Sequence, residues 1–520
     1  MTMTTSEPGA PAAARRRAGR GTRARRASAP TLSLARIAHP YAPLALFDED
    51  EIEAIHLTAM RILEELGIEL LSADARARLA AAGAEVDEGT QTVRLDRGLV
   101  AELVARAPAA FDLTPANPEH RVHLGGRDVV TSLVAGPPAV HDRIRGRRQA
   151  NLEDYCDFIR LTHLSDAVHM IGNQVAAPIE LDAETRHLDC YLANLTLSDR
   201  SYHCTAIGRA RAVDGIEMMA LARGISVEAM AADPGVTTII SVNSPRRFDD
   251  AMADGLVAMA EHGQAAAITP FTLMGAMSPV TLPAALAQQT AEALFGVCLA
   301  QAVRPGAPVM YGAFTSNVDM KSGAPAFGTP EHVQALVASG QLARRYGLPY
   351  RASPVATSNA ADAEAAWEQM MALWGCAMGG AHLWYHAAGW LEGGLCASFE
   401  KFVMDVDMLE QMFAFLRKPA VDEASLGFDA IAQVPPGGHF FGTEHTLARY
   451  ETAFHKGKLS DWRNHESWQA DGAKTAEIRA TERWQTMLAE YAPPEMDPAR
   501  REALEAFVAR RKEEIARDGL

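Results

Sequence analysis

Hydrophobic and polar residues alternate along the middle of the chain in a pattern that repeats eight times. Short apolar runs are separated by stretches with the apolar period of amphipathic helices, and several stretches end in glycine just before the next run. The runs begin 28–42 residues apart. They are VVTSLVAG (129–136), AVHMIGNQV (167–175), YHCTAI (202–207), TTIISVN (237–243), AAAITPF (265–271), APVMYGAF (307–314), PYRAS (349–353) and AHLWYHAAG (381–389). The alternation predicts eight strand–helix units.

Eight such units over roughly 260 residues predict an α/β fold, a (β/α)8 TIM barrel formed by residues 127–420. The alternative is a doubly wound open sheet. That fold would be favoured by a GxGxxG turn after the first strand, and VAGPPAV does not supply one. We therefore predict the barrel.

The flanking segments have different patterns. Residues 39–126 predict a helical extension with a small β element, beginning with the amphipathic run EIEAIHLTAMRILEELGI, and residues 421–520 predict a C-terminal helical wrap. Residues 1–38 are rich in Ala and Arg without apolar periodicity, which predicts a disordered tail. Eight arginines against Glu7 give this tail a charge of +7.

Composition and charge narrow the function. A hydrophobic content of 48% suffices for a large core, and no uncharged apolar run reaches the length of a membrane-spanning helix. Six cysteines without a CxxC pair predict a reduced, cytoplasmic protein. The net charge of -16 leaves -16 - 7 = -23 outside the tail, which disfavours nucleic acid and suits a cationic ligand or a basic partner.

Active sites of barrels lie at the carboxyl ends of the strands. The residues found there are Asn173, Gln174, Thr205, Asn243, Ser244, Thr269, Phe271, Met274, Tyr311, Phe314, Arg351, Ser353, Tyr385, His386 and Trp390. The set has no opposed carboxylate pair, which disfavours glycoside hydrolysis, and the chain has neither a GxSxG elbow nor a P-loop. Two histidine pairs, at 382/386 and 163/169, lack a third ligand, so we predict no metal site.

Aromatic residues gather in HLWYHAAGWLEGG, which contains Trp384, Tyr385 and Trp390. Aromatic residues of this kind most often pack in the hydrophobic core. The functional alternative is a cage for a quaternary ammonium, whose cation–π attraction is worth about 0.5–2 kcal/mol per contact. The residues alone predict a barrel enzyme that acts on an amine, and nothing more specific.

Several segments also resemble the trimethylamine methyltransferase family. They are RGRRQANLEDYCDFIRLTHL, NSPRRFDDAMADGLVAMAEHG, PFTLMGAMSPVTLPAALAQQTAEALFG, FGTPEHVQALVASGQLARRYGLP and SFEKFVMDVDMLEQM, in collinear order within about residues 40–420. The resemblance implies a (β/α)8 barrel that demethylates a methylated amine and passes the methyl group to Co(I) of a separate corrinoid protein. The corrinoid is then supplied by a partner, and no cofactor is bound covalently.

The chain departs from the archaeal members of this family, which carry pyrrolysine. All 520 residues are ordinary, including PYRASPVATSNAAD, where pyrrolysine would be expected. Pyrrolysine is thought to activate a tertiary amine. A quaternary ammonium already leaves as a neutral tertiary amine, so the resemblance implies a quaternary-amine methyltransferase, of the glycine betaine type.

On this resemblance we predict that Trp384, Tyr385, Trp390, Tyr311 and Phe314 form the cage, with His386 among the substrate-binding residues. Arg351 would bind a betaine carboxylate. Asn243 and Gln174 would orient the substrate or the corrinoid, and Glu331 and Glu400 follow the family pattern in a catalytic or structural role.

We also predict a homo-oligomer. Two alternatives remain open: a trimethylamine-type or zinc-dependent methyltransferase on the same barrel, and a non-catalytic quaternary-amine binder. The lack of a Cys-rich ligand set disfavours zinc.

Overall fold

The computed structural model describes residue 34 and residues 36–520, so most of the predicted tail lies outside the described residues. Contacts divide the chain into the units Met1–Leu32 and Ser33–Leu520. Within the second unit, Ile37–Ala38 form strand β1, which pairs with Val129 and Asp128. These last two residues of the predicted tail are therefore part of a sheet, because Ile37 is an apolar side chain that becomes buried.

The centre of the fold is a curled sheet of seven strands in the order β1-β7-β18-β17-β14-β12-β10, with every neighbouring pair parallel except β1–β7. The other six strands are β7 (Asp128–Leu133), β10 (Thr237–Ile240), β12 (Ala265–Ile268), β14 (Val309–Gly312), β17 (Tyr350–Ala352) and β18 (Leu383–Ala388). Each overlaps one of the eight predicted apolar runs. The α/β class is thus confirmed.

The other two runs form single parallel bridges instead of ladders. They join Ser132 to Met170, Ile171 to Tyr202, and His203 to Thr237. The segments 167–175 and 202–207 therefore lie between β7 and β10, yet the assigned sheet has seven strands and not the eight of the predicted barrel.

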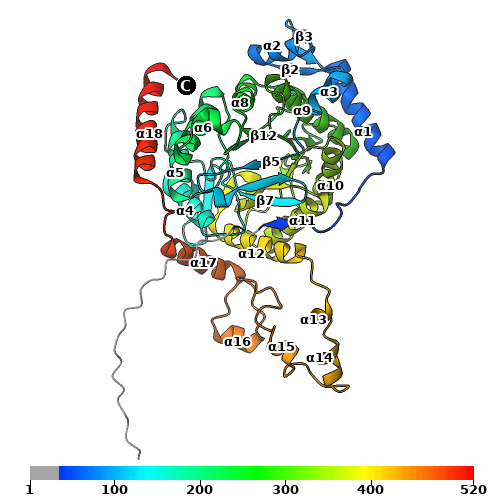
Figure 1. The fold of residues 1–520 in the computed structure, drawn as a ribbon, viewed down its shortest axis with the longest axis vertical. Helices are drawn as coiled ribbons and strands as arrows, with labels where there is room; N and C mark the ends of the chain where they lie inside the picture. Colours follow the sequence, from blue (N-terminus) through cyan, green and yellow to red (C-terminus); the bar gives the residue numbers. More distant parts are fainter. Residues whose placement is uncertain (1–33, 35) are drawn as a thin grey trace, which may run out of the picture. The chain divides into compact units, whose positions relative to one another are not determined.

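Helices surround this sheet in sequence order (Figure 1). They are α4 (Leu152–His163), α5 (Arg186–Leu197), α6 (Arg209–Arg223), α8 (Asp250–Glu261), α9 (Leu282–Val303), α10 (Pro330–Arg345), α11 (Ala363–Gly379) and α12 (Phe399–Leu416). Several begin at the polar caps that the sequence provides: Asn151 accepts from the Asp154 amide at 2.9 Å, and Asp249 accepts from Met252 at 2.7 Å. Gly224, in the left-handed region, ends α6.

The N-terminal extension covers one side of this ring. Its elements are α1 (Glu49–Arg61), α2 (Ala73–Ala81), α3 (Arg97–Val104) and the strands β2 (Ile68–Leu70), β3 (Glu85–Asp87) and β4 (Thr92–Arg94). The three strands form a small sheet with β11 (Arg247–Phe248), which comes from the loop after β10. Helices α1 and α3 contact α9, which explains why α9 is buried along most of its length. Next along the chain comes the hairpin of β5 (Ala110–Leu113) and β6 (Val122–Gly125). Its Leu113 and Leu124 pack with Val130, Met310 and Leu383 inside the curled sheet.

The C-terminal region divides into two parts. Helix α17 (Ala476–Glu490) packs on α12 and α4, and α18 (Pro498–Asp518) packs on α5 and α6. Between α12 and α17 the chain forms four short helices that stand away from the ring (Figure 1). These are α13 (Glu423–Leu426), α14 (Phe428–Gln433), α15 (Glu444–Leu447) and α16 (His465–Ala470). The predicted wrap over 421–520 is therefore limited to α17 and α18.

Across residue 34 and residues 36–520, no helix has the length and apolar character needed to cross a membrane. All six cysteines are free thiols, and all except Cys156 are buried.

Candidate active site

Two accessory sheets are built from the loops that follow the central strands. One contains β19 (Trp390–Leu391), β20 (Cys396–Ser398), β8 (Ala139–Asp142) and β9 (Gly146–Gln149), from the loops after β18 and β7. The other contains β13 (Leu273–Met274), β15 (Ser316–Val318) and β16 (Pro325–Ala326), from the loops after β12 and β14. Both therefore belong to the carboxyl edge of the central sheet, where ligand sites of parallel sheets form.

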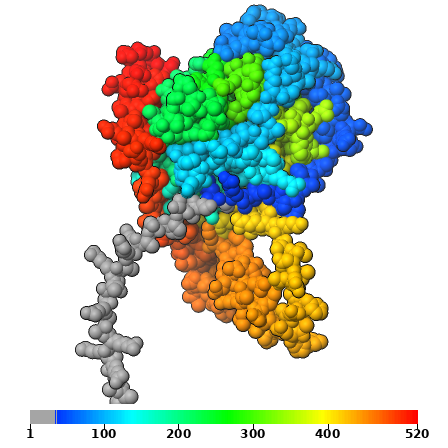
Figure 2. All heavy atoms as spheres, viewed as in Figure 1, coloured from blue at the N-terminus to red at the C-terminus, as the bar shows by residue number. Residues whose placement is uncertain are grey.

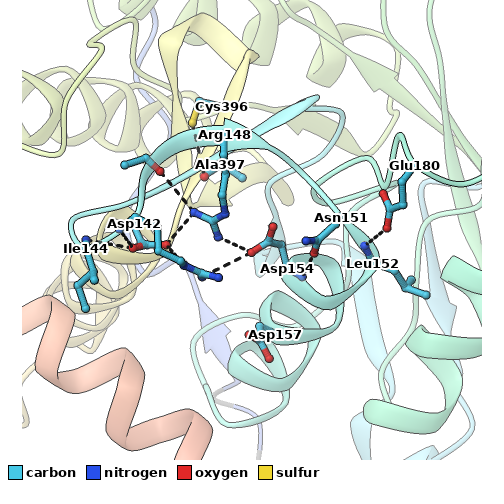
Figure 3. A network of polar contacts seen from close by, with 12 residues as sticks. Asp142, Ile144, Arg148, Asn151, Leu152, Asp154, Asp157, Glu180, Cys396 and Ala397 are labelled. Carbon is cyan, nitrogen blue, oxygen red and sulfur yellow. Dashed lines mark hydrogen bonds and ion pairs between the residues drawn. The ribbon is translucent and has the colours of Figure 1, made fainter.

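A charged network fastens the first accessory sheet to α4 (Figure 3). The buried Asp142 accepts hydrogen bonds from the amides of Ile144 and Arg145, at 3.0 and 2.7 Å, and from the side chains of Arg145 and Arg148, each at 2.8 Å. Arg148 also pairs with buried Asp154. Burial raises the pKa of Asp142, but the hydrogen bonds from Arg145 outweigh it and leave that pKa below its usual value.

A second ion pair joins this frame to the turn after β19. The Arg147 guanidinium donates to the Glu392 carboxylate at 2.9 Å. Next to that turn, the Trp390 indole donates to the Ala356 carbonyl at 3.0 Å. Trp390 is therefore held at a fixed position on the wall of the site.

Aromatic rings from β18 and from the loops after β12 and β14 meet near Trp390. Phe314 lies 6.1 Å from Trp390, 5.6 Å from His386 and 5.2 Å from Phe327, between ring centroids. Phe271 adds a contact to Phe314 at 5.0 Å. We call Phe271, Phe314, Phe327, Tyr385, His386 and Trp390 the ring cluster.

Arg351, on β17, lies against this cluster. Its guanidinium carbon is 4.9 Å from the ring centre of Tyr385 and 5.2 Å from that of Phe314. The side chain is buried; one nitrogen donates to the Ala313 carbonyl at 3.2 Å, while Nε has no partner. No ion pair among the described residues includes Arg351. Burial lowers the pKa of Arg351 to about 10, so the group stays a cation at neutral pH.

A buried cation without an anion is costly, since the charge has lost its water without gaining a carboxylate. Contact with two ring faces repays part of this cost. The arrangement therefore favours an anionic group as the missing partner of Arg351.

An irregularity in strand β18 directs the side chains of Tyr385 and His386 into the site. The pairing register between β18 and β7 shifts between Trp384 and Ala388, and His386 has a φ of 63°. A non-glycine residue in this region is strained. The Ser353 hydroxyl, 3.1 Å from His386 Nδ1, helps to fix the strained residue.

Tyr385 connects the cluster to two neighbouring segments. Its hydroxyl accepts from the Asn173 amide at 3.1 Å and hydrogen-bonds to His203 Nδ1. Burial, followed by the charge of Arg351, lowers the pKa of His203 to about 3, and the same causes hold the pKa of His386 far below its usual value. Both imidazoles are thus neutral at physiological pH, and neither repels a cationic ligand.

Phe327 and His203 were absent from the sequence-based set. Phe327 follows β16 in a loop and not a central strand, so the strand-end rule passes over it. His203 lies two positions before Thr205 in the run YHCTAI, and residues two apart share one face of a strand. That alternation is the one sequence feature that points to it.

Trp384 and Tyr311 lie away from the cluster. The Trp384 indole donates to the Ala381 carbonyl, and its ring packs against Phe413 of α12. The Tyr311 hydroxyl contacts Gln289 and Thr290 of α9. Both side chains face the surrounding helices, so we leave them out of the cage.

The four residues predicted to orient or catalyse have contacts elsewhere. Exposed Asn243 accepts from the Asp249 amide, and the Gln174 carbonyl accepts from the Gly136 amide. Glu331 is exposed in the first turn of α10. Buried Glu400 accepts from Thr481 and Trp484, each at 2.9 Å, and so fastens α12 to α17. Asn243 and Glu400 thus have structural contacts, and the predicted orienting and catalytic roles of the four residues stay predictions.

In the part of the chain that the structure describes, no three His, Cys, Asp or Glu side chains gather in a way that would hold a metal ion. The imidazoles of His203 and His386 contact Tyr385 and other rings instead.

Comparison with known proteins identifies the family. Residues 14–516 match the family model described as trimethylamine methyltransferase (MTTB). The chain is 35% identical over 474 residues to the glycine betaine methyltransferase of Desulfitobacterium hafniense (strain Y51), covering 91% of this chain and 98% of that protein. It is 27% identical over 453 residues to the trimethylamine methyltransferase MttB of Desulfitobacterium hafniense (strain DSM 10664 / DCB-2), covering 86% and 90%.

Among solved structures, the hydroxylamine complex of MtmB aligns with a TM-score of 0.46 at 10% identity, covering 85% of this chain and 94% of that one. The family match spans nearly the whole chain, including every residue of the ring cluster. The chain belongs to the trimethylamine methyltransferase family, and it is a methyltransferase.

Proposed function

We propose that the protein transfers a methyl group from a carboxylated quaternary amine, of which glycine betaine is the simplest, to Co(I) of a separate corrinoid protein. The observation that carries the proposal is the buried, unpaired Arg351 beside the ring cluster. The name of the 35% identical relative supports the same substrate class.

The two halves of such a zwitterion match two parts of the site. The ring faces of the cluster that Arg351 does not cover, such as that of Trp390, attract a trimethylammonium group by about 0.5–2 kcal/mol per contact. The Arg351 guanidinium donates to the carboxylate, in a charge-assisted hydrogen bond worth about 1.5–3 kcal/mol. Since the Arg351 guanidinium lies about 5 Å from two ring centres of the cluster, the two parts of the site are neighbours, which suits a zwitterion whose charges are close together.

The proposed reaction does not require the protein to transfer a proton. The methyl–nitrogen bond breaks with its electron pair remaining on nitrogen, which leaves as a neutral tertiary amine, and the electron pair of Co(I) forms the new bond to the methyl carbon. No proton moves, in agreement with the neutral imidazoles at the site. The contribution of the residues is to orient one methyl group outward and to exclude water.

For the scaffold, we propose that the curled sheet acts as a closed barrel of eight positions. The bridges Ser132–Met170, Ile171–Tyr202 and His203–Thr237 support this, because they connect β7 to β10 through the two remaining predicted runs. Gly172 supports it too, since a Cβ there would collide with the Val134 carbonyl oxygen. The closure brings Asn173 and His203 beside Tyr385.

The test combines purified protein, free Co(I) cobalamin and a panel of amines, with methylation followed by absorbance. Glycine betaine should react, choline, which lacks the carboxylate, should react poorly, and trimethylamine should not react. Transfer from trimethylamine would replace the proposal with the trimethylamine-type reaction. Betaine binding, measured by calorimetry, without transfer to cobalamin or any corrinoid protein would identify a binder.

A matched pair of variants locates the carboxylate contact. Arg351→Lys keeps the charge but loses the planar fork, and should lower kcat/KM for betaine while leaving that for choline unchanged. Arg463→Lys, on the exposed surface, is the control. Metal analysis of the purified protein tests the zinc-dependent alternative, which requires a stoichiometric ion.

A further inference from the structure

The chain between α12 and α17, residues 417–475, exposes large apolar side chains to an unusual degree. We call it the arm. Figure 2 shows it in yellow and orange, standing off the body of the molecule. Phe441 and Phe454 are each 79% exposed, Phe428 75% and Trp462 73%. Among the hydrophobic residues of the arm, only Ala430 and Leu459 are buried.

The arm cannot be held in shape by its own contacts. Its helices α13 to α16 have four to six residues, far below the length at which an isolated helix is stable in water. Exposed apolar patches of this size mark interaction surfaces. A partner therefore has to cover the arm.

Both ends of the arm are fixed to α12. It starts directly after Phe413 and Phe415, and on its return Lys458 pairs with Glu410 while its amide donates to Asp407 at 2.6 Å. Between these anchors the segment stands away from the ring of helices (Figure 1), which favours a contact with another molecule.

The body of the same chain carries an exposed apolar surface of matching character. On α11, Trp367 and Met371 are 60% and 44% exposed, and Trp374 continues the same helix face one turn later. Phe415 lies 4.9 Å from Trp374 and 5.4 Å from Tyr41, between ring centroids. We call these five residues the stripe.

We propose that two copies of the chain pair through a two-fold axis, with the arm of each lying on the stripe of the other. Such an interface is self-complementary, as closed dimers require. Six arm rings (Phe428, Phe440, Phe441, Tyr450, Phe454 and Trp462) are between 44% and 79% exposed. An aromatic side chain has about 150–250 Å² of surface. Scaled by these exposed fractions, the rings of two arms together offer roughly 1,200–2,000 Å², the size of a stable specific interface.

The position of the arm disfavours the corrinoid protein as its partner. The arm starts at the end of α12 where Phe413 packs on Trp384, at the beginning of β18. The ring cluster lies at the opposite end of that strand, with His386 and Trp390. A protein that presents cobalt to the cluster has to approach that opposite end.

The pairing is tested by the mass of the full-length protein in solution, from light scattering after gel filtration. One chain has a mass of 56.0 kDa, and we expect twice this value or a larger even multiple. Changing Phe428, Phe441 and Phe454 to Ser, or Trp367 and Met371 to Ser, should weaken pairing by on the order of a hundredfold or more and lower the mass. Val280→Ser with Met320→Ser, equally exposed on the body, is the control.

Mixing the two variants gives the sharpest result. The arm variant still has its stripe and the stripe variant still has its arm, so an equimolar mixture regains one of the two contacts and should form heterodimers. Circular dichroism and methyl transfer report that each variant is folded. A monomeric wild-type protein, or an arm variant with unchanged mass, would overturn the proposal. So would loss of corrinoid-protein binding without a change in mass.

Discussion

The ring cluster and the arm are both rich in aromatic residues, but these residues are packed in the cluster and exposed in the arm. At the cluster, ring centroids are 4.3–6.3 Å apart beside a buried cation, and ion pairs fasten the accessory sheet that carries Trp390. In the arm, Phe428, Phe441 and Phe454 are about three-quarters exposed; Phe428 begins the six-residue helix α14, and the other two lie outside helices.

The difference shows what each region lacks. The cluster has its apolar contacts and lacks an anion, whereas most of the large apolar side chains of the arm lack a surface to pack against. An unpaired buried charge calls for a small polar ligand, because only a charge-assisted hydrogen bond offsets its desolvation. Exposed apolar area calls for another protein surface, because hydrophobic burial scales with area.

The largest effect is expected from Arg351→Met. Removal of the guanidinium leaves the substrate carboxylate buried and unpaired, so kcat/KM for betaine should fall about a thousandfold, or ~4 kcal/mol. Stability to urea should not fall, since the change removes an uncompensated charge. Arg463→Met, in the arm, should leave kcat/KM unchanged. A loss of less than tenfold at Arg351 would mean that the carboxylate binds elsewhere.

The frame behind the cluster is probed by Asp142→Asn. Loss of the carboxylate leaves Arg145 and Arg148 without one of their anionic partners, and should lower the free energy of unfolding by about 2–3 kcal/mol. Chemical denaturation measures this change. In the arm, Asp461→Asn removes a similar pair with Arg463 from the exposed surface and should not change the denaturation midpoint. Equal effects at both sites would contradict the rigid frame.

A smaller effect is expected from Tyr385→Phe. The ring remains, but the Asn173 amide and His203 lose the hydroxyl between them, so kcat/KM should fall about tenfold, or ~1.4 kcal/mol. Tyr450→Phe, whose hydroxyl contacts only Glu451 in the arm, is the matched control. If both variants behave like wild type, the hydroxyl has no positioning role.

Much of the scaffold was predictable because apolar alternation records burial. Six of the eight apolar runs contain sheet strands, and the other two form the single bridges. Side-chain direction was less predictable. Trp384 and Tyr385 are neighbours, and the register shift that decides which ring faces the site is a property of the folded pair β18–β7.

The arm shows the opposite limit of sequence reasoning. Its apolar residues predicted a helical wrap, because hydrophobicity records that a side chain is to be buried but not by which molecule. Glu400 shows the same limit for charge: a motif-like position proves to fasten α12 to α17 through Thr481 and Trp484. For the arm and for Glu400 alike, the role of the side chains depends on contacts with partners that are distant in sequence.

The smallest effect concerns pH and tests whether the interior of the cluster stays neutral. Between pH 6.5 and about 9, kcat/KM should vary by less than about twofold, because no group at the cluster changes its charge there and the reaction moves no proton. Below pH 6.5 the unfolded chain protonates His203 while the folded protein, with a pKa of about 3 there, does not. The unfolded state then binds more protons, so stability falls as pH decreases from 6.5 toward 3. A bell-shaped activity profile centred near neutral pH, in protein shown by circular dichroism to be folded, would contradict the neutral interior and require an acid or base that the cluster does not contain.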